Sequence, residues 1–162
     1  MPNLRGHLRS RAVSRVIYGA VVGLALVVAL EDHPPSATGV TAILLGTAFA
    51  AALAELYSEL LGERVHLGPG VGRGHLIAIA ENATAVAIGA GFPAAFFVIA
   101  ATGALELATA FSLAKWSGLG LLSFYGFWAG RLSGADVKGS LLQAVAVGGI
   151  GALVIAIKAL VH

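Results

Sequence analysis

The sequence predicts an all-α integral membrane protein that crosses the bilayer five times. Of its 162 residues, 58% are hydrophobic and only 11% are charged, whereas about a quarter of the residues of a soluble domain are charged. The apolar residues gather in long stretches that can each cross roughly 30 Å of hydrocarbon. There is no cysteine, which excludes disulfides and thiolate metal sites. A net charge of +2 is too small to suggest a nucleic-acid partner.

The predicted spans follow one another with short polar breaks. They cover about Val16–Leu30, Val40–Leu61, His75–Ala101, Leu105–Gly130 and Gly139–Val161. An acidic turn, EDHPP, ends the first span, and a Gly-rich loop, GERVHLGPGVGRG, follows the second. Pro93 lies within the third span and cannot donate a backbone hydrogen bond, so we expect a kink there.

Positive charges set the expected orientation. Arg and Lys residues precede the first span and occupy the second-to-third and fourth-to-fifth connections, at Arg5, Arg9, Arg11, Arg15, Arg64, Arg73, Arg131 and Lys138. Because cytoplasmic loops are enriched in such residues, the N-terminus is predicted to be cytoplasmic and the C-terminus outside. We therefore expect an integral protein of a bacterial-type cytoplasmic membrane.

Two parts are expected along the chain. Residues 1–15 form a basic cytoplasmic segment, and residues 16–162 form the transmembrane domain. The basic segment is interpreted as a topology-setting tail, with an interfacial helix that continues into the first span as the alternative.

Two carboxylates interrupt the second span. Glu55 and Glu59 are four residues apart, so they share one face of a helix. A charge in the bilayer costs on the order of 3 kcal/mol by insertion scales, which makes such residues functional candidates. Glu81, near the cytoplasmic start of the third span, is predicted to converge with them as a metal ligand, because carboxylate oxygens suit divalent cations such as Mn²⁺ and Fe²⁺. The alternative for Glu55 and Glu81 is a buried pair with a cation, either Lys115 or an N-terminal Arg.

Lys115, near the middle of the fourth span, needs a carboxylate, a neutral state or a wet cavity. With Glu106 further out on the same helix, it is predicted to belong to a proton or charge relay that also includes Glu55 and Glu81. Glu59 and Glu106 also have a simpler interpretation as interfacial residues.

Small residues in the spans allow close backbone approach. Gly19 and Gly23, and Gly126 and Gly130, follow the Gly-x-x-x-Gly spacing of membrane helix contacts. These motifs serve either packing within the chain or a homodimer, and a dimer is the favoured oligomer.

Several segments resemble the vacuolar iron transporter family. Residues 15–23 are similar to its Gly-x-x-Asp-Gly segment, Ala54-Glu55-Leu56-Tyr57-Ser58 to its Gly-Glu-Tyr-x-Ser segment, and residues 89–93 to its Gly-Gly-x-x-Pro segment. Residues 126–134 and 139–143 resemble the end of its fourth span and the start of its fifth. The resemblance implies five spans and divalent-metal transport, with Glu55 at the family's span-two glutamate. Val22 stands where the family has its span-one Asp, and the family's metal-collecting insertion is reduced to the short loop.

The leading functional hypothesis is a transporter of Fe²⁺- or Mn²⁺-like cations out of the cytoplasm, coupled to protons, with no permanently bound cofactor. Glu55, Glu59 and Glu81 would be its metal ligands. The alternatives are a non-transporting structural or binding subunit of the same fold, and a small ion or proton channel. The chain has no phosphate-binding loop after a strand and no Ser/His/Asp arrangement, so we do not expect an enzyme.

Overall fold

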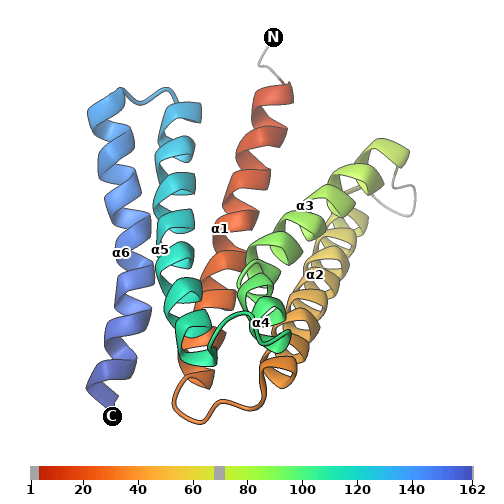
Figure 1. Ribbon diagram of the computed structural model, residues 1–162. Coiled ribbons are helices and arrows are strands. Elements are labelled where there is room, and N and C mark those ends of the chain that lie inside the picture. The colour runs from red at the N-terminus through yellow and green to blue at the C-terminus, as the bar shows by residue number, and fades with distance from the viewer. Residues whose placement is uncertain (1–3, 68–71, 162) are drawn as a thin grey trace.

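A computed structural model describes residues 4–67 and 72–161, with side-chain detail for 12–65, 72–158 and 160. Among these residues, all regular structure is α-helical (Figure 1). The six helices are α1 (Leu4–Leu30), α2 (Ala37–Leu67), α3 (Arg73–Gly91), α4 (Ala94–Ala101), α5 (Leu107–Leu132) and α6 (Val137–Val161). The all-α prediction is confirmed for the described chain.

Membrane-spanning length is clear for part of the bundle. Helices α1, α2 and α6 are long and apolar enough to cross a bilayer, and α3 with α4 forms a further candidate span bent by 50°. The bend falls at Phe92 and Pro93, where the sequence predicted a kink. α5 has 26 residues but includes Lys115 and several small polar residues, and it is not among these candidates. The chain therefore has three to four helices that could span a membrane.

The predicted boundaries agree closely with the helices, with two differences. α2 continues six residues beyond its predicted end at Leu61, because the polar residues that follow the apolar run still favour helix. α1 begins at Leu4 and runs unbroken through the predicted boundary between residues 15 and 16. The basic segment thus continues as helix into the first apolar stretch.

Helix α1 lies at the centre of the fold (Figure 1). It packs mainly against α3 on one side and α5 on the other, while α2 pairs with α3 and α6 pairs with α5. α3 and α5 diverge toward the end of the molecule that carries the N-terminus, and α4 turns back to contact α5 near the opposite end. The molecule is therefore V-shaped in this view, with α1 between the two arms.

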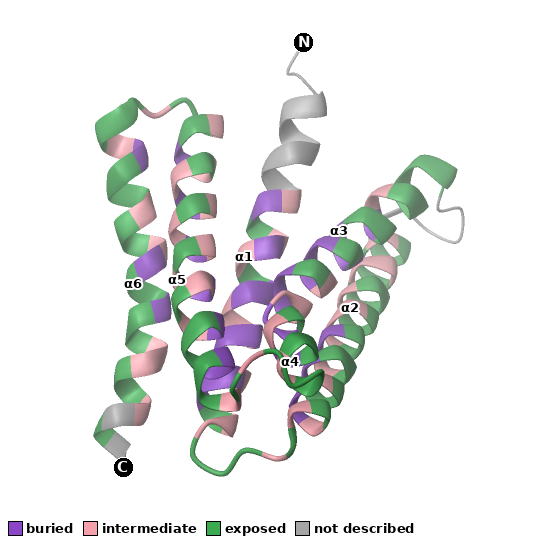
Figure 2. Cartoon of the chain, viewed as in Figure 1, coloured by how far each residue is buried: buried purple, intermediate pink, exposed green. Residues whose placement is uncertain are grey.

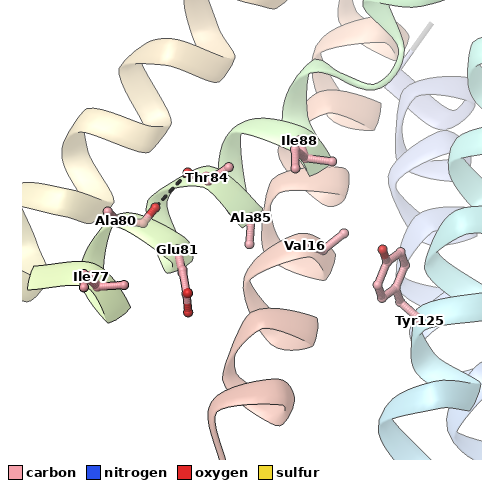
Figure 3. A pocket seen from close by; sticks show the side chains of 8 residues that line it. All are labelled: Val16, Ile77, Ala80, Glu81, Thr84, Ala85, Ile88 and Tyr125. Carbon is pink, nitrogen blue, oxygen red and sulfur yellow. Dashed lines mark hydrogen bonds between the residues drawn. The ribbon is translucent and has the colours of Figure 1, made fainter. Parts of the chain in front are cut away.

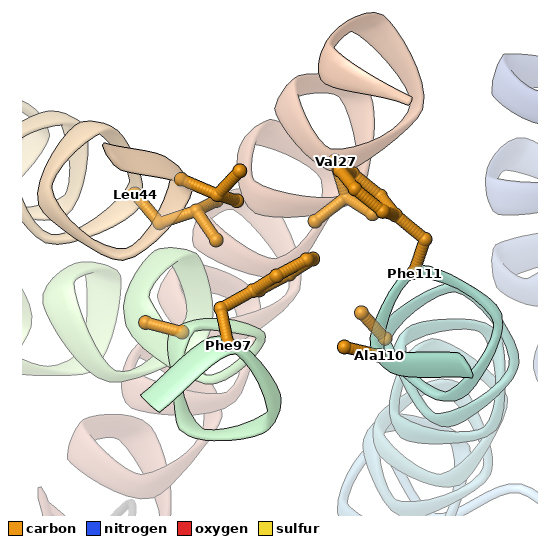
Figure 4. Packing of buried hydrophobic residues seen from close by; sticks show 8 residues of the cluster. Val27, Leu44, Phe97, Ala110 and Phe111 are labelled. Atoms are coloured by element: carbon orange, nitrogen blue, oxygen red, sulfur yellow. The ribbon is translucent and has the colours of Figure 1, made fainter. Parts of the chain in front are cut away.

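The closed end of the V holds the larger apolar core (Figure 4). Phe97 of α4 and Phe111 of α5 meet edge to face, with ring centroids 4.7 Å apart, and Val27 and Leu44 are fully buried beside them. Edge-to-face aromatic pairs add about 1 kcal/mol beyond the burial of their surface. The outward faces of the helices are exposed and largely apolar (Figure 2), as expected for surfaces that lipid covers.

The Gly-x-x-x-Gly motifs are used within the chain. A Cβ on Gly19 would collide with the carbonyl oxygen of Val86, and one on Gly23 would meet the backbone of Ala90. The α1–α3 contact is thus backbone to backbone, the close approach that small residues permit. Gly126 and Gly130 of α5 are packed in the same way against Gln143, Ala144, Val147 and Ser140 of α6.

Candidate functional site

One arginine, two glutamates and an asparagine gather where α1, α2 and α3 meet. Arg15 comes from α1, Glu55 and Glu59 from successive turns of α2, and Asn82 from α3. The two glutamates share a helix face because they are four residues apart. We call these four residues the Arg15 cluster. With 1.5 Å rise per residue, Arg15 lies about 22 Å from Leu30 along α1, within the apolar length of that helix.

One guanidinium bridges both carboxylates. Arg15 Nη1 lies 2.8 Å from Glu55 Oε1, and Nη2 donates a hydrogen bond of 2.8 Å to Glu59 Oε1. Asn82 Nδ2 lies 3.0 Å from each of the two oxygens of Glu59. The alternative in which an N-terminal Arg pairs with Glu55 is therefore what the structure shows.

Glu55 is the less satisfied of the two carboxylates. Its side chain is only 10% exposed, against 17% for Glu59 and 35% for Arg15. Its Oε1 is buried and accepts no well-aligned hydrogen bond, although Arg15 lies at ion-pair distance. A buried acceptor without a hydrogen bond normally costs about 1–3 kcal/mol. Two carboxylates share one cation among the described side chains, so the group keeps an excess of negative charge while both are ionised.

Glu81 does not join this group. It is exposed and makes no hydrogen bond or ion pair with any part of the chain that the structure describes. Successive helical residues point about 100° apart, so when Asn82 faces α2, its neighbour Glu81 is directed toward the groove between α3, α1 and α5 (Figure 3). The predicted convergence of three carboxylates is corrected to two carboxylates and one amide.

Lys115 pairs with neither Glu55 nor Glu81. Its Nζ lies 2.5 Å from Glu31 Oε1, at the end of α1. Lys158 of α6 lies 3.0 Å from Asp32 Oδ1 and 3.6 Å from Glu31 Oε2, and it also donates to the carbonyl oxygen of Val28. This outer network joins the end of α1 to α5 and α6.

The predicted polar relay is not continuous. Glu31 follows Arg15 by sixteen residues, or about 24 Å of helix, and the buried side chains of Leu24 and Val27 lie between them on α1. Glu106 is exposed at the start of α5, with no ion pair among the described residues. Lys115 thus belongs to the outer network, away from Glu55 and Glu81.

No group of three or more His, Cys, Asp or Glu side chains suited to holding a metal ion occurs in the described ranges. The Arg15 cluster offers two carboxylates and the side-chain oxygen of Asn82, with the guanidinium between the two glutamates. In this arrangement Arg15 occupies the position that a cation shared by the two glutamates would take.

Three partners were not singled out from the sequence. An N-terminal Arg was one alternative partner of Glu55, but Arg15 was not distinguished from the other arginines; Asn82 was treated as a neighbour of Glu81, and Glu31 as part of a turn. The available signal was positional: Arg15 is the last basic residue before the first apolar run, and Glu31 immediately follows that run. Each therefore lies at one end of an apolar run, where it can serve as counter-charge to a charged side chain on another helix.

Comparisons with models of protein families, with curated proteins and with solved structures found no match for this chain.

Proposed function

We propose that the chain crosses the bilayer five times, with α3 and α4 as one bent span and α5 as another. The alternation of positive charge supports a cytoplasmic N-terminus in a bacterial-type cytoplasmic membrane. The outer network supports α5 as a span, because it supplies Lys115 with a carboxylate at the end of α1. In this orientation the Arg15 cluster lies in the cytoplasmic half of the membrane.

Within this topology, the protein is a proton-coupled transporter of divalent cations of the Fe²⁺ or Mn²⁺ type, acting outward from the cytoplasm. One observation carries the proposal: two glutamates within the apolar candidate span of α2 are held together by a single guanidinium. The resemblance to vacuolar iron transporters suggests the class of ion, and Glu55 is the residue that corresponds to the span-two glutamate of that family.

The geometry supports a competitive exchange. A divalent cation between Glu55 and Glu59 would displace the tip of Arg15, and the side-chain oxygen of Asn82 would add a neutral ligand if the amide turned. Carboxylates bind a metal only when they are ionised, so protonation would release the ion and restore the Arg15 contact. Glu81 contributes no oxygen to this pair and is given no ligand role here.

Flux measurements test this proposal. Purified protein in liposomes should move Mn²⁺ and move protons in the opposite direction, and Glu55→Gln and Glu59→Gln should each lower the flux at least about tenfold. Glu63→Gln, one turn beyond Glu59 on α2, is the matched control and should transport normally. Unchanged Mn²⁺ flux in both Glu55→Gln and Glu59→Gln would exclude the exchange site.

A structural membrane subunit is the second candidate, and the hydrogen bonds that already satisfy the Glu59 carboxylate favour it. This carboxylate already receives hydrogen bonds from Arg15 and Asn82. A purely structural cluster predicts that Mn²⁺ leaves the unfolding midpoint in detergent unchanged. A transport site predicts a midpoint that rises with Mn²⁺ concentration, because a ligand of the folded state stabilises it by mass action.

A homodimer remains part of the proposal. Gly19, Gly23, Gly126 and Gly130 are occupied within the chain, so the contact between copies would use other faces. Gly46 on α2 and Gly149 on α6 face open space and permit a close approach. Cross-linking in native membranes measures the oligomer directly.

A further inference from the structure

An open groove runs between the arms of the V at the level of the Arg15 cluster (Figure 3). Its volume is about 420 Å³, and it is open over much of its extent. Val16 of α1 forms part of its lining, with Ile77, Glu81, Thr84 and Ile88 from α3 and Tyr125 from α5. The Arg15 cluster lies on the other side of the α1–α3 contact, so the two sites share no residue.

Glu81 is the one charged side chain that lines this groove. It lacks an ion pair or hydrogen bond with any described residue, and the nearby Thr84 hydroxyl is engaged with the carbonyl oxygen of Ala80. An ionised carboxylate in the bilayer without a counter-charge is costly. The groove therefore has a negative charge to neutralise and apolar walls to cover.

The lining favours an organic cation over a metal ion. A divalent metal needs several oxygen ligands, and the groove offers a single carboxylate. A large organic monocation is weakly hydrated, buries apolar surface against Val16, Ile77 and Ile88, and is attracted to the face of an aromatic ring such as that of Tyr125. The groove is open and not an enclosed cavity, so a ligand dissolved in the lipid can enter it.

We propose that this groove binds a lipophilic organic monocation, whose positive centre is attracted both to the carboxylate of Glu81 and to the ring face of Tyr125. The site is separate from the divalent-cation site proposed above. In this proposal Glu81, which is not part of the Arg15 cluster, binds the organic cation.

The test measures binding of tetraphenylphosphonium to the purified full chain in detergent by isothermal titration calorimetry. This cation carries a pH-independent charge on an apolar surface. Saturable binding is expected, and Glu81→Gln should weaken it at least about tenfold, since the Coulomb attraction is lost. Tyr125→Leu should weaken it several-fold, whereas Tyr125→Phe should retain it, because the ring and not the hydroxyl contacts the cation.

Two controls separate the site from partitioning into the micelle. Tetraphenylborate has the same shape and the opposite charge, and it should show no saturable binding. Glu63→Gln should bind tetraphenylphosphonium as the unaltered protein does. Equal affinity in Glu81→Gln, or saturable binding of tetraphenylborate with similar affinity, would overturn the proposal.

A second variant keeps the test independent of how well Glu81→Gln folds. Ile88 is exposed at the groove, so Ile88→Trp fills it and leaves the carboxylate in place. Loss of tetraphenylphosphonium binding in a variant with a normal unfolding midpoint supports the groove, and retained affinity contradicts it. These readouts do not depend on Mn²⁺ flux, so this proposal and the transport proposal can fail separately.

Discussion

Arg15 determines the energetic state of both glutamates that it bridges. Arg15→Met removes the cation and leaves Glu55 and Glu59 facing each other in a mostly buried position. Removing one partner of a fully buried pair costs about 3–5 kcal/mol. Since Arg15 is 35% exposed, we expect a loss of about 2 kcal/mol in the free energy of unfolding, measured by denaturant titration in mixed micelles.

A second substitution distinguishes electrostatics from packing. In Arg15→Met/Glu55→Gln, one of the two carboxylates is neutral, so stability should recover relative to Arg15→Met. Such non-additivity is the mark of residues in direct contact. A double variant that is less stable than Arg15→Met would mean that repulsion between the two carboxylates is not the cause of the stability loss in Arg15→Met.

The sequence identified those residues whose charge is energetically costly in an apolar run. Glu55 and Lys115 are identifiable because a charge inside an apolar run is expensive wherever its partner lies. An N-terminal Arg was one alternative partner for Glu55, but Arg15 and Glu31 could not be singled out, because they occupy the ends of apolar runs, where charges are ordinary. Glu81 lies beside Asn82 in the sequence, and only the rotation of α3 decides which of them faces α2.

At the scale of helices, the α1–α3 contact depends on the absence of side chains. Gly89→Ala places a methyl group against the backbone of Val16 and Ala20. Because both neighbours are backbone, α1 and α3 must separate, and we expect a loss of several kcal/mol in the free energy of unfolding, at least comparable with the ~1–3 kcal/mol of ordinary overpacking.

Gly46→Ala is the matched control for this prediction. Gly46 lies in α2 with nothing within 4 Å of an added Cβ. The substitution should leave stability unchanged or raise it slightly, since Ala favours helix over Gly by about 1 kcal/mol. Equal effects of Gly89→Ala and Gly46→Ala on the unfolding midpoint would contradict the close packing of α1 and α3.

Helix positions follow from the sequence more closely than helix contacts do. Apolar runs, the EDHPP turn and Pro93 locate the bend and most helix ends within a few residues, apart from the start of α1 and the end of α2. The periodicity of a membrane helix is weak, because the lipid face is as apolar as the buried face. The choice of α1 as the central helix therefore comes from the glycine contacts, which the sequence left open between intra-chain and inter-chain packing.

The whole molecule offers a direct test of orientation, because the chain contains no cysteine. His33→Cys lies in the α1–α2 connection and Lys138→Cys at the start of α6, and both positions are exposed. A membrane-impermeant maleimide should label His33→Cys in intact cells and Lys138→Cys only after permeabilisation. The opposite pattern would invert the topology, and equal labelling of both would mean that the two connections lie on one side.

Because α1 is central and is synthesised first, the order of synthesis determines when its ion pairs can form. A chain made from its N-terminus produces α1 first, so this helix is present before any of the helices that pack against it. Arg15 receives both carboxylates as soon as α2 follows. Glu31 must wait for Lys115 and Lys158, which arrive with the last two helices. Arg15, near one end of α1, is therefore paired early in assembly, whereas Glu31, at the other end, is paired only when α5 and α6 pack against α1.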